Sequence, residues 1–355
     1  MAMSRSESKT MTEDKVFYRS SDILDFLESR NYTSLDPYSG LRSPISKLLP
    51  TRTLKRALIQ TFKLAPNRLH KLVGVPQIQM STTLGYALSG AANLGTSISL
   101  ERREKLAKSL LRSQNPDGGW GYEFDVFLRW GKYLQGESNL VATSVCASAL
   151  IEAGIEGKWR DGVINFLEST FRSGYFSYCY SGSPLIHNAN LLAASVMSRL
   201  NGDKDKVTSA ISSSMNCQQA DGSWFYGEHE NLKWIDNFHT VYVLEALMDM
   251  VATENELEQG IAKGFDFWLE NMFVDNQPKY YLSDTNPTRD INTLASAISL
   301  LSHPYVASNL ELKKSELIEA LLHQLMDALN ALDWKQAKFR WDLAPASLAL
   351  SKWEN

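Results

Sequence analysis

The sequence lacks the long apolar segments that place a protein in a membrane. No run of about 18 apolar residues is present, so no membrane-spanning helix is expected. The first twenty residues are polar and mixed in charge, unlike a signal peptide. With 44% hydrophobic and 21% charged residues, the chain has the composition of a globular protein with a large core. We therefore expect a cytoplasmic protein, with a peripheral position at the inner membrane as the alternative.

Cysteine is scarce, and Cys146, Cys179 and Cys217 lie far apart along the chain. An odd number of distant cysteines favours reduced thiols over a disulfide framework. None belongs to a Cys-x-x-Cys pair, so a cysteine-based zinc site is not expected. The sequence predicts neither a metal nor a cofactor.

Acidic residues are absent between Asp36 and Glu101, although the whole chain carries a net charge of -4. The basic residues of this segment are Arg42, Lys47, Arg52, Lys55, Arg56, Lys63, Arg68 and Lys71. Apolar residues are interleaved with them, so residues 42–71 could lie on an anionic membrane surface. Alternatively, the apolar stripe faces the protein and the positive charges are solvated. The overall acidic balance predicts no nucleic-acid partner.

The sequence has no β-rich region and instead repeats one helical pattern at intervals of about 50 residues. Runs of small and apolar residues begin at Met80, Asn139, Asn188, Asn237, Ile291 and Asp342. More charged amphipathic runs lie between them, at residues 100–113, 159–171, 204–217, 257–273 and 312–332. Small residues allow helices to approach closely around a common axis. The alternation therefore predicts an inner and an outer layer of helices.

This pattern predicts an all-α fold, an (α/α)6 toroid of six inner and six outer helices. Only five charged runs lie between the inner runs. The basic helix expected at residues 53–64 is assigned as the sixth outer helix, closing the ring against the last inner helix at 342–353. Residues 1–35 are expected to form a partly disordered N-terminal extension, and residues 36–355 the toroid domain.

Aromatic and glycine turns precede the inner helices, as in Gln114–Tyr122 and Gln219–Tyr226. Asp-Gly supplies the tight reversal, and the Trp can pack over the adjoining helix end. The pattern Gln-x-x-Asp-Gly-Gly/Ser-Trp resembles the QW repeats of the squalene/hopene cyclase and protein prenyltransferase superfamily. That resemblance implies the same toroid fold.

Residues 36–350 resemble more closely a group of bacterial prenyltransferase-like proteins associated with exopolysaccharide and lipopolysaccharide biosynthesis. The matching segments are Asp36–Leu41, Gly119–Asp125, His187–Leu191, Asp236–Thr240, Pro278–Tyr281, Asp290–Ile291 and Arg340–Trp341. The resemblance implies a role in making or modifying a cell-envelope polysaccharide, with a saccharide or lipid-linked saccharide as partner. The group is expected to have His after Asp290-Ile291. This chain has Asn292, which argues against proton transfer at that position.

Motifs of the more distant relatives are missing. The chain has no Asp-x-Asp-Asp tetrad, with which an enzyme resembling hopene cyclase would protonate an alkene. It has no Asp-Asp-x-x-Asp cluster to hold a diphosphate through magnesium. Both absences argue against a terpenoid cyclase or prenyltransferase.

The inner helices of a toroid run in one direction, so their N-terminal ends converge on one mouth of the barrel. Unpaired N–H groups and positive dipole ends favour anions there. Aromatic rings can stack on pyranose faces while polar groups fix hydroxyls, so a sugar site is expected. The predicted substrate-binding residues are Tyr122, Glu123, Asp125, His187, Asn188, Asn190, Asn237, Lys279, Tyr280, Arg289 and Arg340.

Residues 234–247 place candidate catalytic groups at the head of one inner helix. Asp236 would cap the helix, and His239, three residues later, would form an acid/base pair with it. The alternative is structural, with Asp236 only a cap and His239 bonded to a neighbouring turn. Tyr281 and Asp290 are the other candidate catalytic residues.

Three functions remain open from the sequence. The first is a polysaccharide biosynthesis protein that binds and modifies a saccharide, with epimerase- or lyase-type chemistry on a uronic acid. Asn and Arg would neutralise the carboxylate, and His or Tyr would move the C5 proton. The second is a terpenoid cyclase or prenyltransferase acting on a polyprenyl diphosphate. The third is a non-catalytic glycan-binding scaffold.

Overall fold

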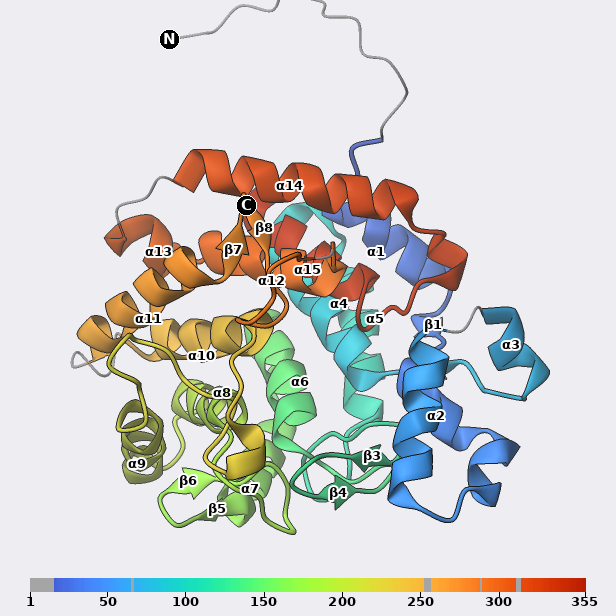
Figure 1. The fold of residues 1–355 in the computed structure, drawn as a ribbon, viewed down its shortest axis with the longest axis horizontal. Coiled ribbons are helices and arrows are strands. Elements are labelled where there is room, and N and C mark those ends of the chain that lie inside the picture. Colours follow the sequence, from blue (N-terminus) through green and yellow to red (C-terminus); the bar gives the residue numbers. More distant parts are fainter. Residues whose placement is uncertain (1–15, 65–66, 252–256, 288, 311–313) are drawn as a thin grey trace, which may run out of the picture.

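The computed structural model describes residues 16–64, 67–251, 257–287, 289–310 and 314–355, and within them helices surround a common axis (Figure 1). The inner helices are α4 (Ser81–Asn93), α6 (Leu140–Glu152), α8 (His187–Arg199), α10 (Asn237–Met250), α12 (Ile291–Leu301) and α15 (Leu343–Glu354). Each packs against the next, and α15 packs against α4, so the ring is closed. The predicted (α/α)6 toroid is confirmed.

Outer helices cover this ring, each packed on an inner helix. They are α1 (Ser20–Ser29), α5 (Leu100–Arg112), α7 (Trp159–Thr170), α9 (Lys204–Met215), α11 (Glu258–Asn271) and α14 (Lys314–Ala331). The short helix α13 (Pro304–Asn309) lies between α12 and α14. Their amphipathic pattern fits this position. In α5, for example, Leu106 and Leu110 are buried while the charged residues Glu101 and Glu104 are exposed.

The sixth outer position is occupied by α1, and the assignment of helix 53–64 to it is wrong. Helix α1 lies within the segment expected to be an extension, yet it packs against both α15 and α4. Ile23, Leu24 and Leu27 are fully buried there. The Ser20 hydroxyl donates to the Ser347 carbonyl at 2.8 Å. These apolar residues and this hydrogen bond fix α1 in the ring.

The basic segment forms a side layer instead. It contains the 3-10 helices η1 (Pro37–Arg42) and η2 (Pro44–Leu48) and the helices α2 (Arg52–Leu64) and α3 (Asn67–Leu72). Helix α2 packs on η1 and buries Ile59 and Phe62. In Figure 1 this layer lies on the right, beside β3 and β4 (described below). Lys55 of α2 lies 5.4 Å from the Phe127 ring of β3, which places α2 beside the barrel mouth.

Small residues bring the inner helices together. A Cβ on Gly85 of α4 would lie 3.1 Å from Val145 Cγ1 of α6. A Cβ on Gly90 of the same helix would lie 3.4 Å from the Ser347 hydroxyl of α15. Side chains larger than these would push the helices apart. The predicted use of small residues in the inner layer therefore has a direct structural cause.

The turns before the inner helices are short antiparallel hairpins or loops. The paired strands are β1 (Thr33–Ser34) with β2 (Ile78–Gln79), β3 (Val126–Phe127) with β4 (Lys132–Tyr133), β5 (Phe171–Arg172) with β6 (Tyr175–Phe176), and β7 (Phe273–Val274) with β8 (Gln277–Pro278). Further 3-10 turns are η3 (Gly95–Ser97), η4 (Glu230–Leu232) and η6 (Trp334–Gln336). Within the described ranges, no helix is both long enough and apolar enough to cross a membrane.

The QW-like turns link successive repeats. Trp120 Nε1 donates to the carbonyl of Leu110 in α5, at 3.1 Å. The equivalent Trp224 Nε1 donates to Ser214 in α9, at 3.0 Å. Gly118 has a φ of +91°, and a Cβ there would lie 2.0 Å from the carbonyl oxygen of Gly162 in α7. Only glycine fits so close to the next outer helix.

Candidate functional site

A cavity of about 310 Å³ opens at the end of the barrel where the inner helices begin. Its wall consists largely of aromatic side chains. These are Tyr38, Tyr86, Tyr122, Phe124, Phe127, Trp130, Tyr133, Tyr178, Tyr226, Trp234, Phe238, Tyr242, Tyr280, Tyr281 and Trp341. Most belong to the turns that precede inner helices, so the repeat itself delivers rings to the mouth. We call this the aromatic cavity.

The rings of the aromatic cavity pack on one another in stacked pairs. Tyr122 stacks on Phe124 with centroids 5.8 Å apart, and Phe124 stacks on Tyr38 at 5.3 Å. On the other side, Tyr226 stacks on Trp234 at 4.5 Å with an angle of 13° between the planes. Such contacts fix ring orientation and leave ring faces and edges toward the cavity. The wall is therefore rigid and suited to stacking.

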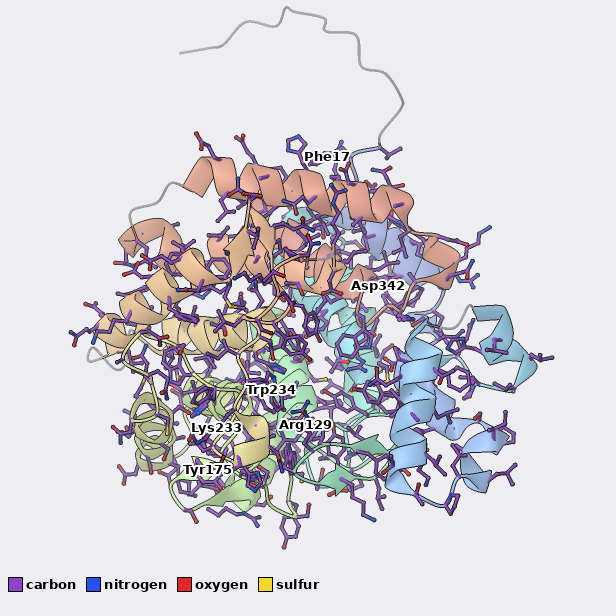
Figure 2. The ribbon with its side chains drawn as sticks, in the orientation of Figure 1. Phe17, Arg129, Tyr175, Lys233, Trp234 and Asp342 are labelled. Atoms are coloured by element: carbon purple, nitrogen blue, oxygen red, sulfur yellow. The ribbon has the colours of Figure 1, made fainter. Side chains whose placement is uncertain are left out.

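Two arginines bring positive charge to this wall. Arg340 donates from Nε to Asp36 Oδ2 at 2.9 Å, and its guanidinium lies 5.0 Å from the Tyr122 ring centroid. Burial by itself would lower the pKa of Arg340, but the charge of Asp36 raises it, so the group stays charged. Arg129 is exposed and lies 4.8 Å from the Trp234 ring, and Figure 2 shows the two residues close together.

The predicted contact between Asp236 and His239 is present at the start of α10. Asp236 Oδ2 lies 2.6 Å from His239 Nδ1, and its Oδ1 accepts from the His239 backbone N–H at 3.0 Å. Trp234 Nε1 donates to the same Oδ2 at 3.0 Å. A carboxylate at Nδ1 favours the tautomer with the proton there, leaving Nε2 with a lone pair. Asp236 is 2% exposed, whereas His239 lines the aromatic cavity.

The tyrosines of the wall are neutral donors. Burial raises the pKa of Tyr122 to about 12. Burial, followed by the negative charge of Asp236, raises the pKa of Tyr280 and of Tyr281. A phenolate is therefore disfavoured at neutral pH, and these hydroxyls can donate hydrogen bonds or a proton. The sequence left His or Tyr as the group that moves the proton. Because these tyrosines are neutral, His is better suited to act as the base.

Buried polar atoms without a protein partner also lie in this wall. They are Thr82 Oγ1 at the start of α4, Trp130 Nε1 between β3 and β4, Asn188 Oδ1 at the start of α8, and Trp341 Nε1 before α15. Thr82 is 3% exposed and Asn188 is 2% exposed. An unsatisfied buried polar group costs about 1–3 kcal/mol. If these side chains turned slightly toward the cavity, hydroxyl or carbonyl groups of a ligand would satisfy the atoms, and a hydrocarbon would not.

Some of the residues expected at the mouth meet in the aromatic cavity. Those that line it are Tyr122, Asn188, His239, Tyr280, Tyr281 and Arg340. Asp236 lies directly behind His239. The expectation rested on their place at or before an inner-helix start, and for these residues the side chain points inward.

Other expected residues are engaged elsewhere. Asn190 bonds the backbone of Phe176 and Ala210, and Asn237 accepts from Trp268 Nε1. Each Asn therefore ties its inner helix to an outer one. Asp290 caps α12 by accepting from the Thr293 N–H at 2.8 Å.

Several other charged residues of the turns also lie outside the cavity wall. Glu123 faces Arg42 at 3.8 Å, and Asp125 accepts from the Gln135 N–H. Arg289 pairs with Asp327 at 3.2 Å, and Lys279 lies within 3.5 Å of the Leu282 carbonyl. His187 is buried between Ser214 and Glu228. These side chains are held by contacts outside the cavity, which residue type alone does not reveal.

Sequence reasoning missed part of the wall. The hairpin β3–β4 contributes Phe127, Trp130 and Tyr133, and no repeat signal marks this insertion. Tyr86 and Tyr242 lie one turn inside α4 and α10. Their positions could have been found, because each is an aromatic residue in a run of otherwise small or aliphatic residues.

A second cavity, of about 470 Å³, opens at the opposite end of the barrel, where the inner helices end. We call it the charged cavity. Tyr86, Tyr242 and Asn292 border both cavities. The hydroxyls of Tyr86 and Tyr242 lie 3.1 Å apart and form part of the partition.

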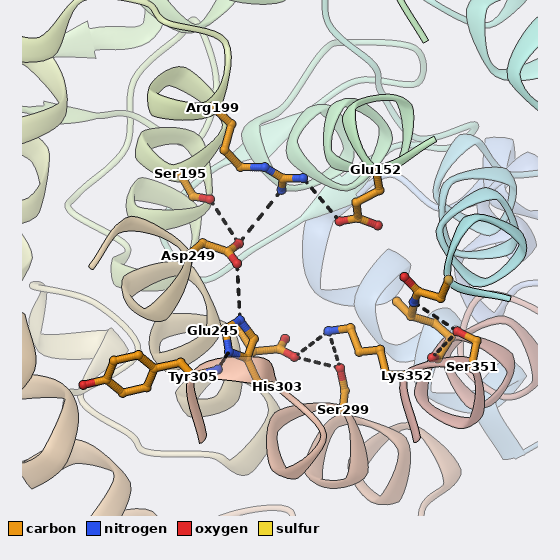
Figure 3. Close-up of polar contacts among 12 residues, drawn as sticks. Glu152, Ser195, Arg199, Glu245, Asp249, Ser299, His303, Tyr305, Ser351 and Lys352 are labelled. Atoms are coloured by element: carbon orange, nitrogen blue, oxygen red, sulfur yellow. Dashed lines mark hydrogen bonds and ion pairs between the residues drawn. The ribbon is translucent and has the colours of Figure 1, made fainter. Parts of the chain in front are cut away.

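The charged cavity contains groups that pair with one another (Figure 3). Lys352 donates to Glu245 at 2.9 Å and to Ser299 at 2.7 Å. Arg199 lies 3.6 Å from Glu152 and 3.9 Å from Asp249.

His303 completes this network and shifts the pKa of Asp249. Its Nε2 lies 3.3 Å from Asp249 Oδ1. Burial by itself would raise the pKa of Asp249, but His303, Arg199 and Lys352 together lower it. The acidic groups of this network thus already have cationic partners, which suits a role in holding the helix ends together.

No protein-family model matches the sequence, and no curated protein is similar to it in sequence. The fold is similar to a possible GH105 family member from Salmonella enterica serovar Paratyphi A, with a TM-score of 0.61, 10% identity and 99% of both chains covered. It is similar to ent-copalyl diphosphate synthase from Streptomyces platensis, with a TM-score of 0.55, 16% identity and 84% of this chain covered. This chain spans 55% of that synthase.

A crystal structure of D-mannose isomerase is also similar, with a TM-score of 0.52 and 14% identity over 77% of this chain and 85% of that one. These identities establish the fold alone. The resemblance to toroid proteins of the terpene-cyclase kind is confirmed at that level. The similar structures give no link to exopolysaccharide or lipopolysaccharide synthesis. The toroid is shared by carbohydrate enzymes and terpene cyclases.

Proposed function

We propose that this protein binds an acidic saccharide in the aromatic cavity and modifies it by proton transfer, as a step in making a cell-envelope polysaccharide. The observation that carries the proposal is the combination of stacked rings with unpaired buried polar atoms and the Asp236–His239 pair. Rings alone would suit any flat or apolar ligand. The unpaired atoms of Thr82, Asn188 and Trp341 favour one rich in hydroxyls.

The positive charge of the wall supports an acidic sugar. Arg129 lies against Trp234 and Arg340 against Tyr122, and none of the described residues lining the cavity is Asp or Glu. The N-terminal ends of the inner helices add positive dipole ends at the same mouth. The carboxylate of a uronic acid would be attracted to this positive charge. The carboxylate charge would need to be neutralised before the C5 proton becomes acidic.

Proton abstraction at C5 follows from the same groups. His239 Nε2 would take the C5 proton, while the bonding electron pair moves into the carboxylate to give an enolate held by arginine. In elimination the enolate collapses to a C4–C5 double bond, and the C4 oxygen leaves with a proton from a neutral tyrosine such as Tyr280. In epimerisation the proton returns to the opposite face of C5. Asp236 would stabilise the imidazolium in both cases.

The second candidate is a terpenoid cyclase or prenyltransferase. It is favoured by the number of rings in the wall and by the fold shared with ent-copalyl diphosphate synthase. It is opposed by the missing aspartate motifs and by the absence of Asp and Glu among the described residues of the wall. A saccharide ligand accounts for the unpaired polar atoms, and a polyprenyl chain does not.

The side layer suits a lipid-linked substrate, and we include a membrane contact in the proposal. Leu48 is 78% exposed and Leu72 is 82% exposed, and both lie in the stretch 37–100 that contains no acidic residue. Exposed leucines among basic residues favour adsorption to an anionic bilayer. The same layer contributes Ile59 and Gln60 to the cavity wall, so a docked membrane would adjoin the mouth.

The test is turnover of uronate-containing oligosaccharides in D₂O, followed by mass spectrometry and NMR. We expect deuterium at C5 or an unsaturated product. His239→Ala should lower the rate by about 10²–10⁴-fold, as loss of a general base does, and His323→Ala on the exposed face of α14 is the matched control. Calorimetric binding with no mass or stereochemical change would leave only the glycan-binding scaffold. Cyclisation of a polyprenyl diphosphate would instead establish the second candidate.

Sedimentation with lipid vesicles tests the proposed membrane contact. We expect binding to vesicles containing phosphatidylglycerol and little binding to pure phosphatidylcholine. The double variant Leu48→Ser/Leu72→Ser should reduce binding, while Leu134→Ser, exposed on the hairpin β3–β4, should not. Equal binding of all three proteins would refute the membrane contact.

A further inference from the structure

We propose that His187, Cys217 and Glu228 form a binding site for a divalent transition-metal ion, best matched by Zn²⁺, on the rim of the barrel. Each residue offers one ligand atom, and the three atoms all lie within 4.8 Å of one another. With Zn–N near 2.0 Å and Zn–S near 2.3 Å, tetrahedral ligand atoms lie about 3.3–3.6 Å apart. Shifts of about 1 Å would therefore close the site around an ion.

The three ligands come from separate segments that the backbone already holds together. His187 opens α8, and Glu228 follows a β-bridge between Ile186 and Gly227. The Glu228 N–H donates to the Leu185 carbonyl at 2.8 Å, which fixes the carboxylate beside the imidazole. His187 Nε2 and Glu228 Oε1 are 3.0 Å apart.

Cys217 approaches from the outer layer. It lies two residues beyond α9, where its N–H donates to the Ser214 carbonyl at 3.1 Å. The three ligands thus connect the start of α8, the end of α9 and the loop before α10. A bound ion would link two successive repeats at this point.

The imidazole of His187 has the support expected behind a metal ligand. Its Nδ1 lies 3.1 Å from the Ser214 hydroxyl, which also accepts from Asn190 Nδ2 at 2.9 Å. A hydrogen bond at one ring nitrogen fixes the ring and directs the other nitrogen to the metal. His187 is 1% exposed, so its orientation does not change freely.

The other side of the site is open. The Glu228 side chain is 33% exposed, so an ion can enter and a water molecule can complete four-coordination. Thiolate, imidazole and carboxylate together suit Zn²⁺ or Co²⁺ better than Mg²⁺ or Ca²⁺. Burial and the charge of Glu228 raise the pKa of the Cys217 thiol, and a metal ion would replace its proton.

The competing explanation is a simple hydrogen bond between His187 and Glu228 that satisfies a buried imidazole. In that case Cys217 takes no part in the interaction, so a substitution of Cys217 distinguishes the metal site from the hydrogen bond. The experiment uses full-length protein treated with chelator and then titrated with Co²⁺. We expect one Co²⁺ per chain, a thiolate-to-cobalt charge-transfer band, and displacement of Co²⁺ by Zn²⁺.

Cys217→Ser should abolish the charge-transfer band and weaken Zn²⁺ binding by more than about 100-fold in competition with a chromogenic chelator, because it removes one of three protein ligands. Cys179→Ser, the matched control, should leave both unchanged. Ser214→Ala should weaken Zn²⁺ binding by about 10–100-fold while keeping the band. If Cys217→Ser fails to fold, Glu228→Gln at the open side provides the same comparison.

Absence of the band, or equal Zn²⁺ affinity of the wild type and Cys217→Ser, would overturn the metal site. This measurement does not involve saccharide turnover, so its result is independent of the proposed function.

Discussion

The two ends of the barrel are built from the same six inner helices but have opposite chemistry. At the helix starts the wall comes mainly from turns, which supply rings, hydroxyls and unpaired polar atoms. At the helix ends it comes mainly from the helices themselves, and its charged groups, such as Lys352 and Glu245, are paired. The charged cavity also has unpaired buried atoms, Ser144 Oγ and Ser302 Oγ, so the ends differ in having rings at one and paired charges at the other. The rings, and not the paired charges, are available to a ligand.

The pKa values of two carboxyl groups, one at each end, shift in opposite directions. Asp342 lies just before α15 at the aromatic end, and burial raises its pKa from 3.8 to about 6. At the charged end, His303 and the nearby cations outweigh burial and lower the pKa of Asp249. At Asp342 burial outweighs the charges nearby, whereas at Asp249 the charges nearby outweigh burial.

The largest effect on stability is expected at the charged end. Lys352→Met would leave Glu245 largely buried without its cation, and breaking such a pair costs on the order of 3 kcal/mol. Arg129→Ala at the exposed rim of the aromatic cavity should change stability by less than about 0.5 kcal/mol while weakening saccharide binding. Urea denaturation measures the first effect and calorimetry the second.

The double variant Lys352→Met/Glu245→Gln is the control for that prediction. It removes both charges, so it should recover much of the lost stability. If Lys352→Met proved neutral while Arg129→Ala unfolded the protein, the division between a structural end and a ligand end would be wrong.

The pH dependence of stability should differ between the two ends by on the order of 1–3 kcal/mol. Because the folded-state pKa of Asp342 is raised, the folded protein loses stability as pH rises from about 4 to about 6. Asp342→Asn should remove that loss and stabilise the protein above pH 6. Asp249 has a lowered pKa, so its contribution is present above its ordinary pKa of 3.8 and disappears as pH falls through the folded-state value.

Asp249→Asn should therefore destabilise the protein at pH 7, with a difference that shrinks below about pH 4. Melting temperatures of both variants between about pH 2 and pH 8 test these two expectations. Parallel pH profiles for the two variants would contradict the contrast between the ends.

A smaller loss of stability than at the charged end is expected at the partition between the two cavities. Tyr242→Phe removes one neutral hydrogen bond to Tyr86, which is worth about 0.5–1.5 kcal/mol. Both cavities should remain separate, because the rings stay in place. Denaturation measures the energy, and a loss above about 3 kcal/mol would show that the partition supports the ring more than its contacts indicate.

The sequence predicted the toroid because small and charged helices alternate with a clear period. It misassigned the sixth outer helix because α1 is short and lies before the repeats begin, whereas helix 53–64 has a stronger amphipathic pattern. At the site, Asp236 and His239 followed from helix-capping geometry. The eight residues that did not reach the cavity are Glu123, Asp125, His187, Asn190, Asn237, Lys279, Arg289 and Asp290. Their side-chain directions depend on contacts with neighbouring repeats, which the sequence pattern does not show.

The inferred metal site shows a second limit of sequence reasoning. His187, Cys217 and Glu228 are separated by 30 and 11 positions and follow no known ligand spacing. They meet only because the β-bridge of Ile186 with Gly227 aligns two loops.

Because α1 and α15 are neighbours in the closed ring, the order of the helices along the chain could be permuted without changing which helices pack together. Ser20 and Ser347 are bonded across a sequence separation of 327 positions, and Val16 is bonded to Asn330 across 314. Because these two regions are already side by side, a circular permutant that joins them and opens a surface turn elsewhere would preserve every helix pair. The contact of α1 with α15 would then lie within a continuous chain, and the ring of helices would be unchanged.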